Sequence, residues 1–219
     1  MKVILFGATG MVGQGVLREC LLDPAVTEVL AVGRSATGQR HEKLRELTTP
    51  NVADVSAYES RLAGYDACFF CLGVSAAGMS EADYTRLTYD LTLAVATTLA
   101  RLNPGMTFVY VSGAGTYSSE QGRMMWARVK GRTENALLRL PFRAAYMFRP
   151  GFIQPLHGVV SKTRLYRAVY AVTTPIFPLL KALGPSVATT TEQVGRAMIA
   201  VARDGYPKRV LEQRDINSL

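Results

Sequence analysis

The sequence has few of the residues that hold metal ions or crosslink a chain: three cysteines and two histidines among 219 residues. Three unpatterned cysteines do not suggest a disulfide framework, and they favour a reducing compartment. Cys68 and Cys71 form a C-x-x-C pair inside Ala67–Leu72, an apolar run typical of a buried strand. Residues three apart on a strand point to opposite faces, so we expect packing and no redox pair. His41 and His157 are far apart in the sequence with no cysteine near them, so no metal site is predicted.

Long apolar runs are also lacking. No stretch offers the roughly 20 apolar residues that a membrane-spanning helix needs. Val3–Phe6 is too short for the apolar part of a signal peptide and runs directly into glycines. We therefore expect a cytoplasmic location. The G-x-S-x-G elbow of many hydrolases and the phosphate loop of nucleotide triphosphatases are absent as well.

Acidic residues are absent from the whole interval between Glu134 and Glu192, although the formal net charge is already +8. The interval is compatible with a solvated basic surface, an anionic substrate or an anionic membrane surface. No nucleic-acid-binding motif is present, so we expect no nucleic acid partner. Its apolar part, Ala168–Leu180, is short and contains two prolines. We predict a lid over a substrate pocket, with peripheral membrane contact as the alternative. The basic residues of the interval are Arg139, Arg143, Arg149, Lys162, Arg164, Arg167 and Lys181.

What the chain does contain is an alternation of apolar runs and helical patterns, within an ordinary composition of 48% hydrophobic residues. This alternation predicts an α/β fold with a doubly wound parallel sheet in a single domain, residues 1–219, with 152–190 as a small covering segment. The strands are predicted at Lys2–Phe6, Glu28–Val32, Val52–Val55, Ala67–Leu72, Met106–Val111 and Ala144–Phe148, with a last short one at Arg209–Glu212. The helices are predicted after Met11, from Ser80 to Leu102, over Gln121–Leu140 and over Thr191–Asp204, whereas Arg40–Leu47 is polar and weakly helical.

The first strand ends in a glycine-rich turn that leads into the first helix. Its spacing is G-x-x-G-x-x-G, from Gly7 through Gly10 to Gly13. Gly7 allows a sharp turn, Gly10 a close approach of the backbone to a pyrophosphate, and Gly13 tight packing of the helix on the sheet. Backbone N–H groups and the positive end of the helix dipole then face the phosphates. The segment predicts a dinucleotide site whose residues include Gly7, Thr9, Gly10, Met11, Val12 and Gly13.

Two further strand ends bear on this site. After Glu28–Val32, where an NAD site usually has a carboxylate for the ribose 2′-hydroxyl, the chain has Arg34. Because a guanidinium matches a phosphate in bidentate fashion, we expect NADP(H) in preference to NAD(H). Asp54 and Val55 are predicted near the adenine ring, and Leu72 and Gly73 where the cofactor passes the fourth strand.

Three segments carry a family resemblance: Gly7–Gly13, Ser112-Gly113-Ala114, and Trp126 to Gly131, with Arg149-Pro150-Gly151 added. Together they resemble the atypical and extended branch of the short-chain dehydrogenase/reductase superfamily. The chain is most similar there to single-domain epimerase-like and Tat-interacting-protein-like oxidoreductases. The resemblance implies a Rossmann-type fold and a nicotinamide cofactor.

The resemblance also implies roles for individual residues. In that family a serine follows the fifth strand, and a Y-x-x-x-K pair shares one face of the next helix. Ser112 and Lys130 match by position, so Ser112 would polarise the substrate oxygen and Lys130 would hold the nicotinamide ribose. The tyrosine position holds Trp126, whose indole N–H cannot act as an acid or base. Tyr117, in the preceding loop, or water would then supply the proton.

Two functions are compatible with these residues. The first is an NADP(H)-dependent oxidoreductase of the atypical short-chain type that acts on a small or lipid-like carbonyl or hydroxyl substrate. The second is a protein that binds NADP(H) for sensing or regulation without turnover, and Trp126 keeps this alternative open.

Overall fold

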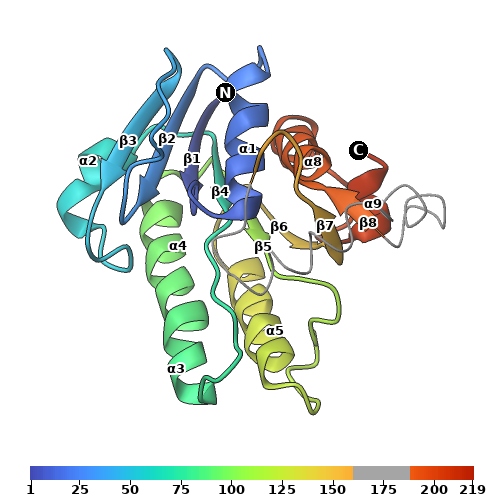
Figure 1. Cartoon of the computed structure of the whole chain (residues 1–219). Helices are drawn as coiled ribbons and strands as arrows, with labels where there is room; N and C mark the ends of the chain where they lie inside the picture. The colour runs from blue at the N-terminus through green and yellow to red at the C-terminus, as the bar shows by residue number, and fades with distance from the viewer. Residues whose placement is uncertain (160–187) are drawn as a thin grey trace.

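The computed structural model describes residues 1–159 and 188–219. Seven strands form one sheet in the order β3-β2-β1-β4-β5-β6-β9, and every neighbouring pair is parallel (Figure 1). Chain order reverses between β1 and β4, where a doubly wound sheet opens a crevice at its carboxyl edge. The strands are β1 (Lys2–Phe6), β2 (Glu28–Gly33), β3 (Leu44–Thr48), β4 (Ala67–Phe70), β5 (Thr107–Val111), β6 (Ala144–Arg149) and β9 (Val210–Glu212).

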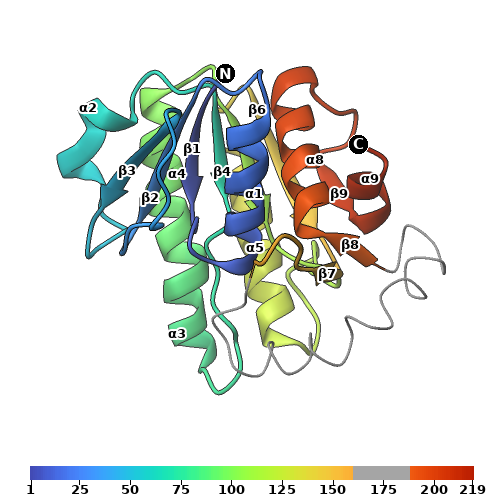
Figure 2. The same ribbon diagram turned by 45° about the horizontal axis from the view of Figure 1, so that its top comes forward.

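Helices cover both faces of the sheet (Figures 1 and 2). On one face α1 (Met11–Leu22), α8 (Thr191–Asp204) and the short α9 (Gln213–Asn217) close one apolar core. On the other face the second core lies under α2 (Glu59–Leu62), α4 (Leu91–Leu102) and α5 (Met125–Leu138). A row of aromatic rings crosses this second face from β1 to the residues after α5, through Phe6, Phe70, Phe108 and Phe142. The predicted doubly wound parallel sheet is confirmed.

The helix predicted from Ser80 to Leu102 is continuous but changes its winding. It begins as α3 (Glu81–Thr85), passes through the π-helical turn η2 (Arg86–Asp90) and continues as α4. The Ser80 hydroxyl accepts a hydrogen bond from the Asp83 N–H, as the predicted cap requires. Leu87 and Leu91 follow one another by four residues, so they share a face that will line the cavity described below.

The prediction for the third strand is wrong. The strand is Leu44–Thr48, in a segment predicted as weakly helical, and Val52–Val55 is not a strand. Leu44–Thr48 is the edge of the sheet and pairs only with β2, so its polar side chains can face water. Val52 and Val55 are buried all the same, but they enter the core from turns that precede the 3₁₀ segment η1 (Ser56–Tyr58).

One helix is shorter at both ends than predicted. The helix predicted over Gln121–Leu140 is α5, which begins at Met125, so the loop after β5 is longer than expected. The C-x-x-C pair behaves as predicted: Cys68 belongs to one core, and Cys71 packs against the other. Both are free, and burial raises the pKa of each thiol.

The segment predicted as a lid, 152–190, is described only at its ends. There β7 (Phe152–Gln154) and β8 (Ala188–Thr190) pair in parallel as a small second sheet. The interior of the predicted lid, including the apolar part Ala168–Leu180, lies outside the described residues. Thr190 caps α8 by accepting a hydrogen bond from the Gln193 N–H.

Candidate functional site

The glycine-rich turn between β1 and α1 has the close backbone packing expected of a phosphate-binding loop. Gly7 has a φ of 81°, a conformation that residues with a Cβ rarely adopt. A Cβ on Gly13 would lie 2.0 Å from the Gly7 carbonyl oxygen, and one on Gly10 would lie 3.3 Å from it. The first turn of α1 contains Met11, Val12 and Gly13, and its N-cap residue, Gly10, has no side chain with which to cap it. Its N–H groups are therefore free to face an anion.

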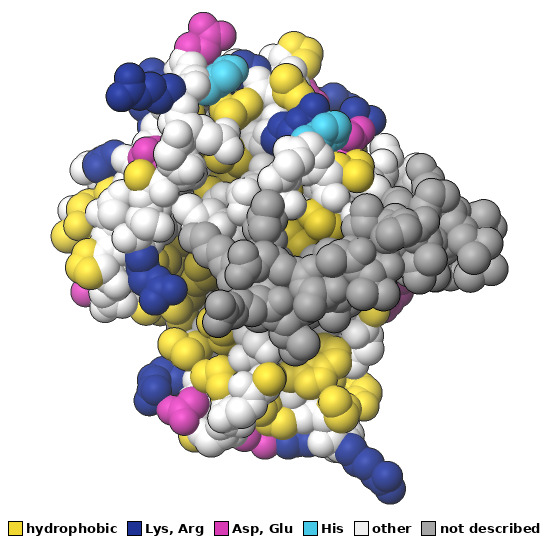
Figure 3. Space-filling model, viewed as in Figure 1, with side chains coloured by type: hydrophobic (Ala, Val, Ile, Leu, Met, Phe, Trp, Pro, Cys, Tyr) yellow, Lys and Arg dark blue, Asp and Glu magenta, His cyan; other side chains and the backbone are white. Residues whose placement is uncertain are grey.

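A cavity of about 350 Å³ opens beside this turn, at the carboxyl ends of β1, β2 and β4. Its walls include four of the residues predicted to bind a cofactor: Gly7 and Thr9 from the turn, and Leu72 and Gly73 from the chain after β4. Apolar side chains close it on the helical side at Leu87 and Leu91, and the chain after β3 closes it at Pro50, Asn51 and Val52. In the view of Figure 3, apolar side chains are exposed in several patches over the lower part of the molecule, with charged and other polar groups between them.

Arg34 lines the same cavity, directly after β2. Its side chain is exposed and has no hydrogen-bond or ion-pair partner among residues 1–159 and 188–219. Glu46 on β3 is a nearby acid that was not predicted from the sequence. Its Oε1 accepts hydrogen bonds of 2.6 and 2.7 Å from the N–H and hydroxyl of Thr37, so it fixes the loop after Arg34.

Asp54 and Val55 are not among the residues that line the cavity. Val55 is 2% exposed and belongs to the core. The Asp54 carboxylate accepts hydrogen bonds from the Ser56 hydroxyl and N–H, which lower the pKa of that carboxyl. Asn51 and Val52, two to three residues earlier in the chain, do line the cavity.

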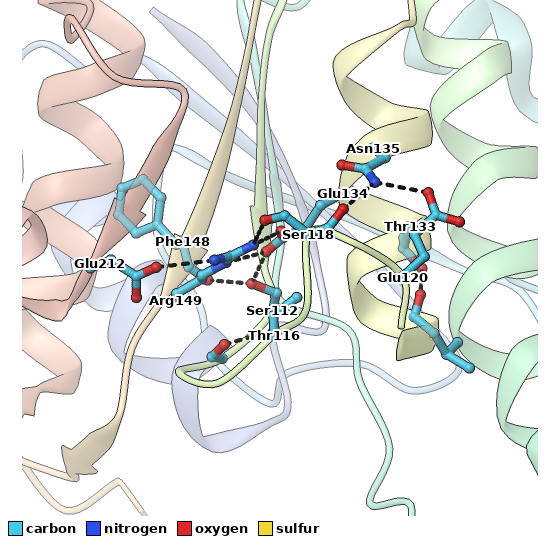
Figure 4. A network of polar contacts seen from close by, with 12 residues as sticks. Ser112, Thr116, Ser118, Glu120, Thr133, Glu134, Asn135, Phe148, Arg149 and Glu212 are labelled. Atoms are coloured by element: carbon cyan, nitrogen blue, oxygen red, sulfur yellow. Dashed lines mark hydrogen bonds and ion pairs between the residues drawn. The ribbon is translucent and has the colours of Figure 1, made fainter. Parts of the chain in front are cut away.

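Ser112, which follows β5, is 6% exposed and points into a buried polar network (Figure 4). Its Oγ lies 2.5 Å from Glu134 Oε1 and 3.0 Å from the Phe148 carbonyl oxygen. A hydroxyl has one hydrogen, so the stronger acceptor, the Glu134 carboxylate, takes it. The hydrogen of the Ser112 hydroxyl is therefore already used in the bond to Glu134.

Arg149 is the counter-ion of Glu134. Its Nε donates to Glu134 Oε1 at 3.0 Å and its Nη2 to Ser118 Oγ at 2.6 Å, while its Nη1 contacts Glu212 at 3.1 Å. Figure 4 shows its guanidinium between Glu212 on β9 and the group formed by Ser112, Ser118 and Glu134. Glu134 is 1% exposed and Arg149 8%, so this pair is an internal joint between α5, β6 and β9.

Lys130 lies on the same face of α5, one turn before Glu134. Its ammonium donates a hydrogen bond to the Ser112 carbonyl oxygen and lies 6.0 Å from the centre of the Tyr110 ring. Burial lowers the pKa of Lys130 to about 8, although the Glu134 charge works in the opposite direction. Lys130 is not among the residues that line the 350 Å³ cavity; it lies at the next strand end, beyond β4.

Of the two aromatic candidates, one lies on α5 and the other on the loop that packs against it. Trp126 is half-buried, one helical turn before Lys130, and its ring lies 3.7 Å from where a Cβ of Gly115 would be. The Tyr117 backbone is held against α5: its N–H donates to the Ala127 carbonyl oxygen. The Tyr117 ring packs on Gly122, where an added Cβ would come within 2.4 Å of it. The structure thus brings Ser112, Lys130 and Trp126 together, with Tyr117 turned toward its own loop.

A second hollow, of about 420 Å³, lies over the outer side of α1. It brings together His41 and His157, which are far apart in the sequence. His157 has a φ of 56°, and its Nε2 lies 2.7 Å from the Glu192 carboxylate. Within the described ranges, no group of three or more potential metal ligands occurs.

Two of the basic residues of the acid-free interval make hydrogen bonds that join elements of the fold. Arg149 is paired as described above, and Arg143 donates from Nη2 to the Thr107 hydroxyl and the Ala202 carbonyl oxygen. The residues from Lys162 to Lys181 lie outside the described residues.

Known proteins share this architecture and sequence. The NAD dependent epimerase/dehydratase family matches residues 3–142, most of the sheet together with the glycine turn and α5. The chain belongs to this family, and the resemblance stated from its motifs is confirmed. The solved structure of the Bordetella bronchiseptica enzyme WbmF in complex with NAD⁺ is 17% identical with a TM-score of 0.67; the match covers 99% of this chain and 76% of that one.

Two curated relatives are more similar in sequence. The mitochondrial protein fmp52 of Emericella nidulans is 30% identical over 159 residues, 69% of this chain and 66% of the relative. The protein HTATIP2 of Rattus norvegicus is 26% identical over 154 residues, 69% of this chain and 62% of the relative. The match therefore spans just under two thirds of each of these relatives. Within residues 1–159 and 188–219, no helix is long and apolar enough to cross a membrane.

Proposed function

We propose that this chain is an NADP(H)-dependent oxidoreductase of the atypical short-chain type, which acts on a small or lipid-like carbonyl or hydroxyl substrate. The observation that carries the proposal is the tight glycine turn before α1: Gly7 and Thr9 line a cavity, and the N-cap residue Gly10 has no side chain to cap the helix. A Cβ at Gly7 or Gly13 would collide with the chain's own backbone, so these glycines allow the tight turn that a dinucleotide-binding βαβ unit needs. Membership of a family described as NAD dependent, and the NAD⁺ complex of WbmF, support a nicotinamide dinucleotide there.

The preference for NADP(H) rests on Arg34. It lines the cavity, and its guanidinium has no partner among the residues that the structure describes; Glu46, the acid on the neighbouring strand, is bound to Thr37. A ribose 2′-phosphate would give Arg34 a bidentate, charge-assisted partner. A ribose 2′-hydroxyl is uncharged and has a single oxygen, so it would not give Arg34 such a partner.

The chemistry belongs at the end of β5. A bound nicotinamide would exchange a hydride with the substrate carbon. Lys130 would hold the ribose beside it, and the Ser112–Glu134 contact would fix the loop that forms the substrate side. The substrate oxygen needs a proton donor as well, for which Tyr117 or water is the alternative set out from the sequence.

Arg34→Asp tests the cofactor proposal. We expect NADPH affinity to fall by about 1–3 kcal/mol, through the loss of a charge-assisted contact and the addition of a repulsion, while NADH affinity stays the same or improves. Titration of both cofactors by calorimetry measures this. Arg40→Asp is the matched control, because it makes the same charge change in the same loop at a residue that does not line the cavity. A wild-type preference for NADH would contradict the proposal.

The second candidate function is NADP(H) binding without turnover. It is favoured by Trp126 in the tyrosine position and by the engagement of the Ser112 hydroxyl with Glu134. A chain that binds NADPH but oxidises it with no member of a broad panel of aldehydes and ketones would fit this candidate better.

The proposed location is the cytoplasm, in keeping with the free cysteines. The name of the Emericella relative makes the mitochondrion the competing location. Fractionation of cells that express the chain decides between them, and co-sedimentation with anionic vesicles at low and physiological salt tests the membrane alternative to the lid.

A further inference from the structure

The site lacks a phenol where its proton donor should be. Trp126 and Lys130 are four residues apart on α5 and share one face, so Trp126 occupies the place of the tyrosine. An indole N–H can donate a hydrogen bond, but it does not release its proton at physiological pH. Reduction of a carbonyl nevertheless requires a proton for the oxygen.

The Lys130 ammonium is an acid one helical turn from that place. Among the described residues it has no carboxylate in ion-pair contact: its contacts are the Ser112 carbonyl oxygen and the Tyr110 ring. The closest carboxylate, Glu134, is itself bound by Arg149 and Ser112. An ammonium that is partly buried without a counter-ion is destabilised, which makes its proton easier to release.

The charged and titratable groups around Lys130 come from four elements. Glu134 favours the ammonium, and Arg149 on β6 offsets that charge. Tyr110 on β5 is 1% exposed, and burial raises its phenol pKa further, so it stays neutral. Tyr84 on α3 is 2% exposed. Arg128, two residues before Lys130 on α5, forms an ion pair with Glu81. With burial opposing the ammonium, the pKa of about 8 places Lys130 close to physiological pH, where an acid works best.

We propose that Lys130 is the proton donor of this site, in place of the tyrosine. An Nζ–H bond of Lys130 breaks while an O–H bond forms on the substrate oxygen, and the amine left behind takes a proton from water before the next turnover. Oxidation of an alcohol runs the same transfer backward, with the neutral amine as base. The reduced nicotinamide dinucleotide is the hydride source, so this inference rests on the proposed function.

Tyr117 is less well placed for the role. Its backbone N–H donates to the Ala127 carbonyl oxygen, and its ring packs on Gly122. The phenol therefore lies against the loop that carries it. Lys130, in contrast, is held at the carboxyl end of β5 by its bond to Ser112.

The first test measures the acidity of Lys130 without substrate. The full-length chain is labelled with acetic anhydride between pH 6 and 11, and the modification of each lysine is followed by peptide mass spectrometry. We expect a labelling midpoint near pH 8 for Lys130. Lys208 is the internal control, because Asp215 raises its pKa and keeps it protonated. Saturating NADPH should slow the labelling of Lys130 and leave Lys208 unchanged.

A midpoint at or above pH 10 for Lys130, or no protection by NADPH that binds, would overturn the inference. A wild-type chain that binds no NADPH would overturn the proposed function instead, and the labelling midpoint would still report on the lysine. The two failures are therefore distinguishable.

The second test separates proton donation from ribose binding. Lys130→Arg keeps the positive charge but cannot release a proton, because the guanidinium pKa exceeds 12. With NADPH and 4-nitrobenzaldehyde as probes, we expect kcat to fall by about 10²–10⁴-fold, with NADPH affinity within about threefold of wild type. Lys208→Arg makes the same exchange at an exposed lysine outside the site, so it is the matched control and should change kcat by less than about threefold. Wild-type kcat in Lys130→Arg, or a loss of 10²-fold in Tyr117→Phe, would refute the assignment.

Discussion

Glu134 is the residue at which three parts of the molecule meet. Its carboxylate accepts from Ser112 and from two nitrogens of Arg149, and Arg149 in turn reaches Glu212 on β9. Burying an isolated carboxylate is very costly, whereas a hydrogen-bonded pair can be accommodated. The hydroxyl of Ser112, the serine predicted to face the substrate, is one of the groups that hydrogen-bond this buried charge.

At the same scale, Lys130 couples function to stability. Its pKa in the folded chain, about 8, lies below the ordinary value of 10.5. Between these two values the unfolded chain binds more protons than the folded one, so the stability of the wild type rises with pH there. Below pH 8 both states carry the charge, and the folded state bears the full cost of burying it.

Lys130→Met should therefore raise the free energy of unfolding by about 1–2 kcal/mol at pH 7, with the lost bond to Ser112 offsetting part of the gain. The advantage should shrink as the pH rises from 8 to 10.5. Urea denaturation of both proteins at pH 7 and pH 10 measures it. Lys208→Met removes a stabilised, exposed ammonium and should bring no gain at pH 7. A Lys130→Met protein that is less stable than wild type at pH 7 would show that the ammonium is not strained.

At the scale of elements, the loop after β5 is fixed by its contact with α5. Gly131 touches the Tyr117 carbonyl so closely that a Cβ would lie 1.8 Å from its oxygen. Glycine inside a helix normally costs about 1 kcal/mol relative to alanine. Its presence in α5 is thus explained by the space the loop needs.

Gly131→Ala should lower the free energy of unfolding by about 1–3 kcal/mol, despite the better helix propensity of alanine, because the loop or the helix must move. Gly105→Ala is the control: no atom lies within 4 Å of the added Cβ, so we expect a change of less than about 0.5 kcal/mol. Thermal denaturation of the two variants compares them. A gain of stability in Gly131→Ala would mean that the loop adapts freely.

The sequence predicts the buried elements well and the edge elements poorly. Lys2–Phe6 and Glu28–Gly33 are almost wholly apolar because both faces are covered, and such runs are recognisable. Leu44–Thr48 is polar because it pairs on one side only, and its helix-like appearance misled the prediction. The register of β7 against β8 could not be predicted, since each is three residues long and they are 33 residues apart.

The candidate site divides in the same way. The glycine turn and Arg34 are local features, and the structure puts both at the cavity. The Glu134–Arg149 pair joins a helix to a strand end, and only its chemistry gave a signal: an acid four residues after Lys130, and a charge directly after an apolar strand. The rest of the candidate site could not be predicted because it depends on the direction of side chains. The sequence does not show, for example, that the Ser112 hydroxyl points toward α5.

At the scale of the whole molecule, both halves of the proposed site lie along one edge of the sheet. The cavity lies at the ends of β1, β2 and β4, and Lys130 and Ser112 lie at the end of β5. The Arg149 network continues the same edge to β6 and β9. A ligand that fills the cavity thus contacts several elements that are distant in the sequence, and it should stabilise the fold as a unit.

NADPH at 100 times its Kd should raise the free energy of unfolding by about 2.7 kcal/mol, since it binds the folded chain and not the unfolded one. For a chain of this size that corresponds to an increase of about 5–10 °C in Tm. NADH at the same concentration lacks the phosphate partner of Arg34; if it binds about 100-fold more weakly, it should raise Tm by only about 1 °C. Arg34→Ala should bring the NADPH shift down to the NADH shift, whereas Arg40→Ala should leave the two apart. Differential scanning calorimetry of the three proteins with each cofactor measures these shifts. Equal shifts for NADPH and NADH in the wild type would contradict the role of Arg34, and no shift with either would contradict binding in the cavity.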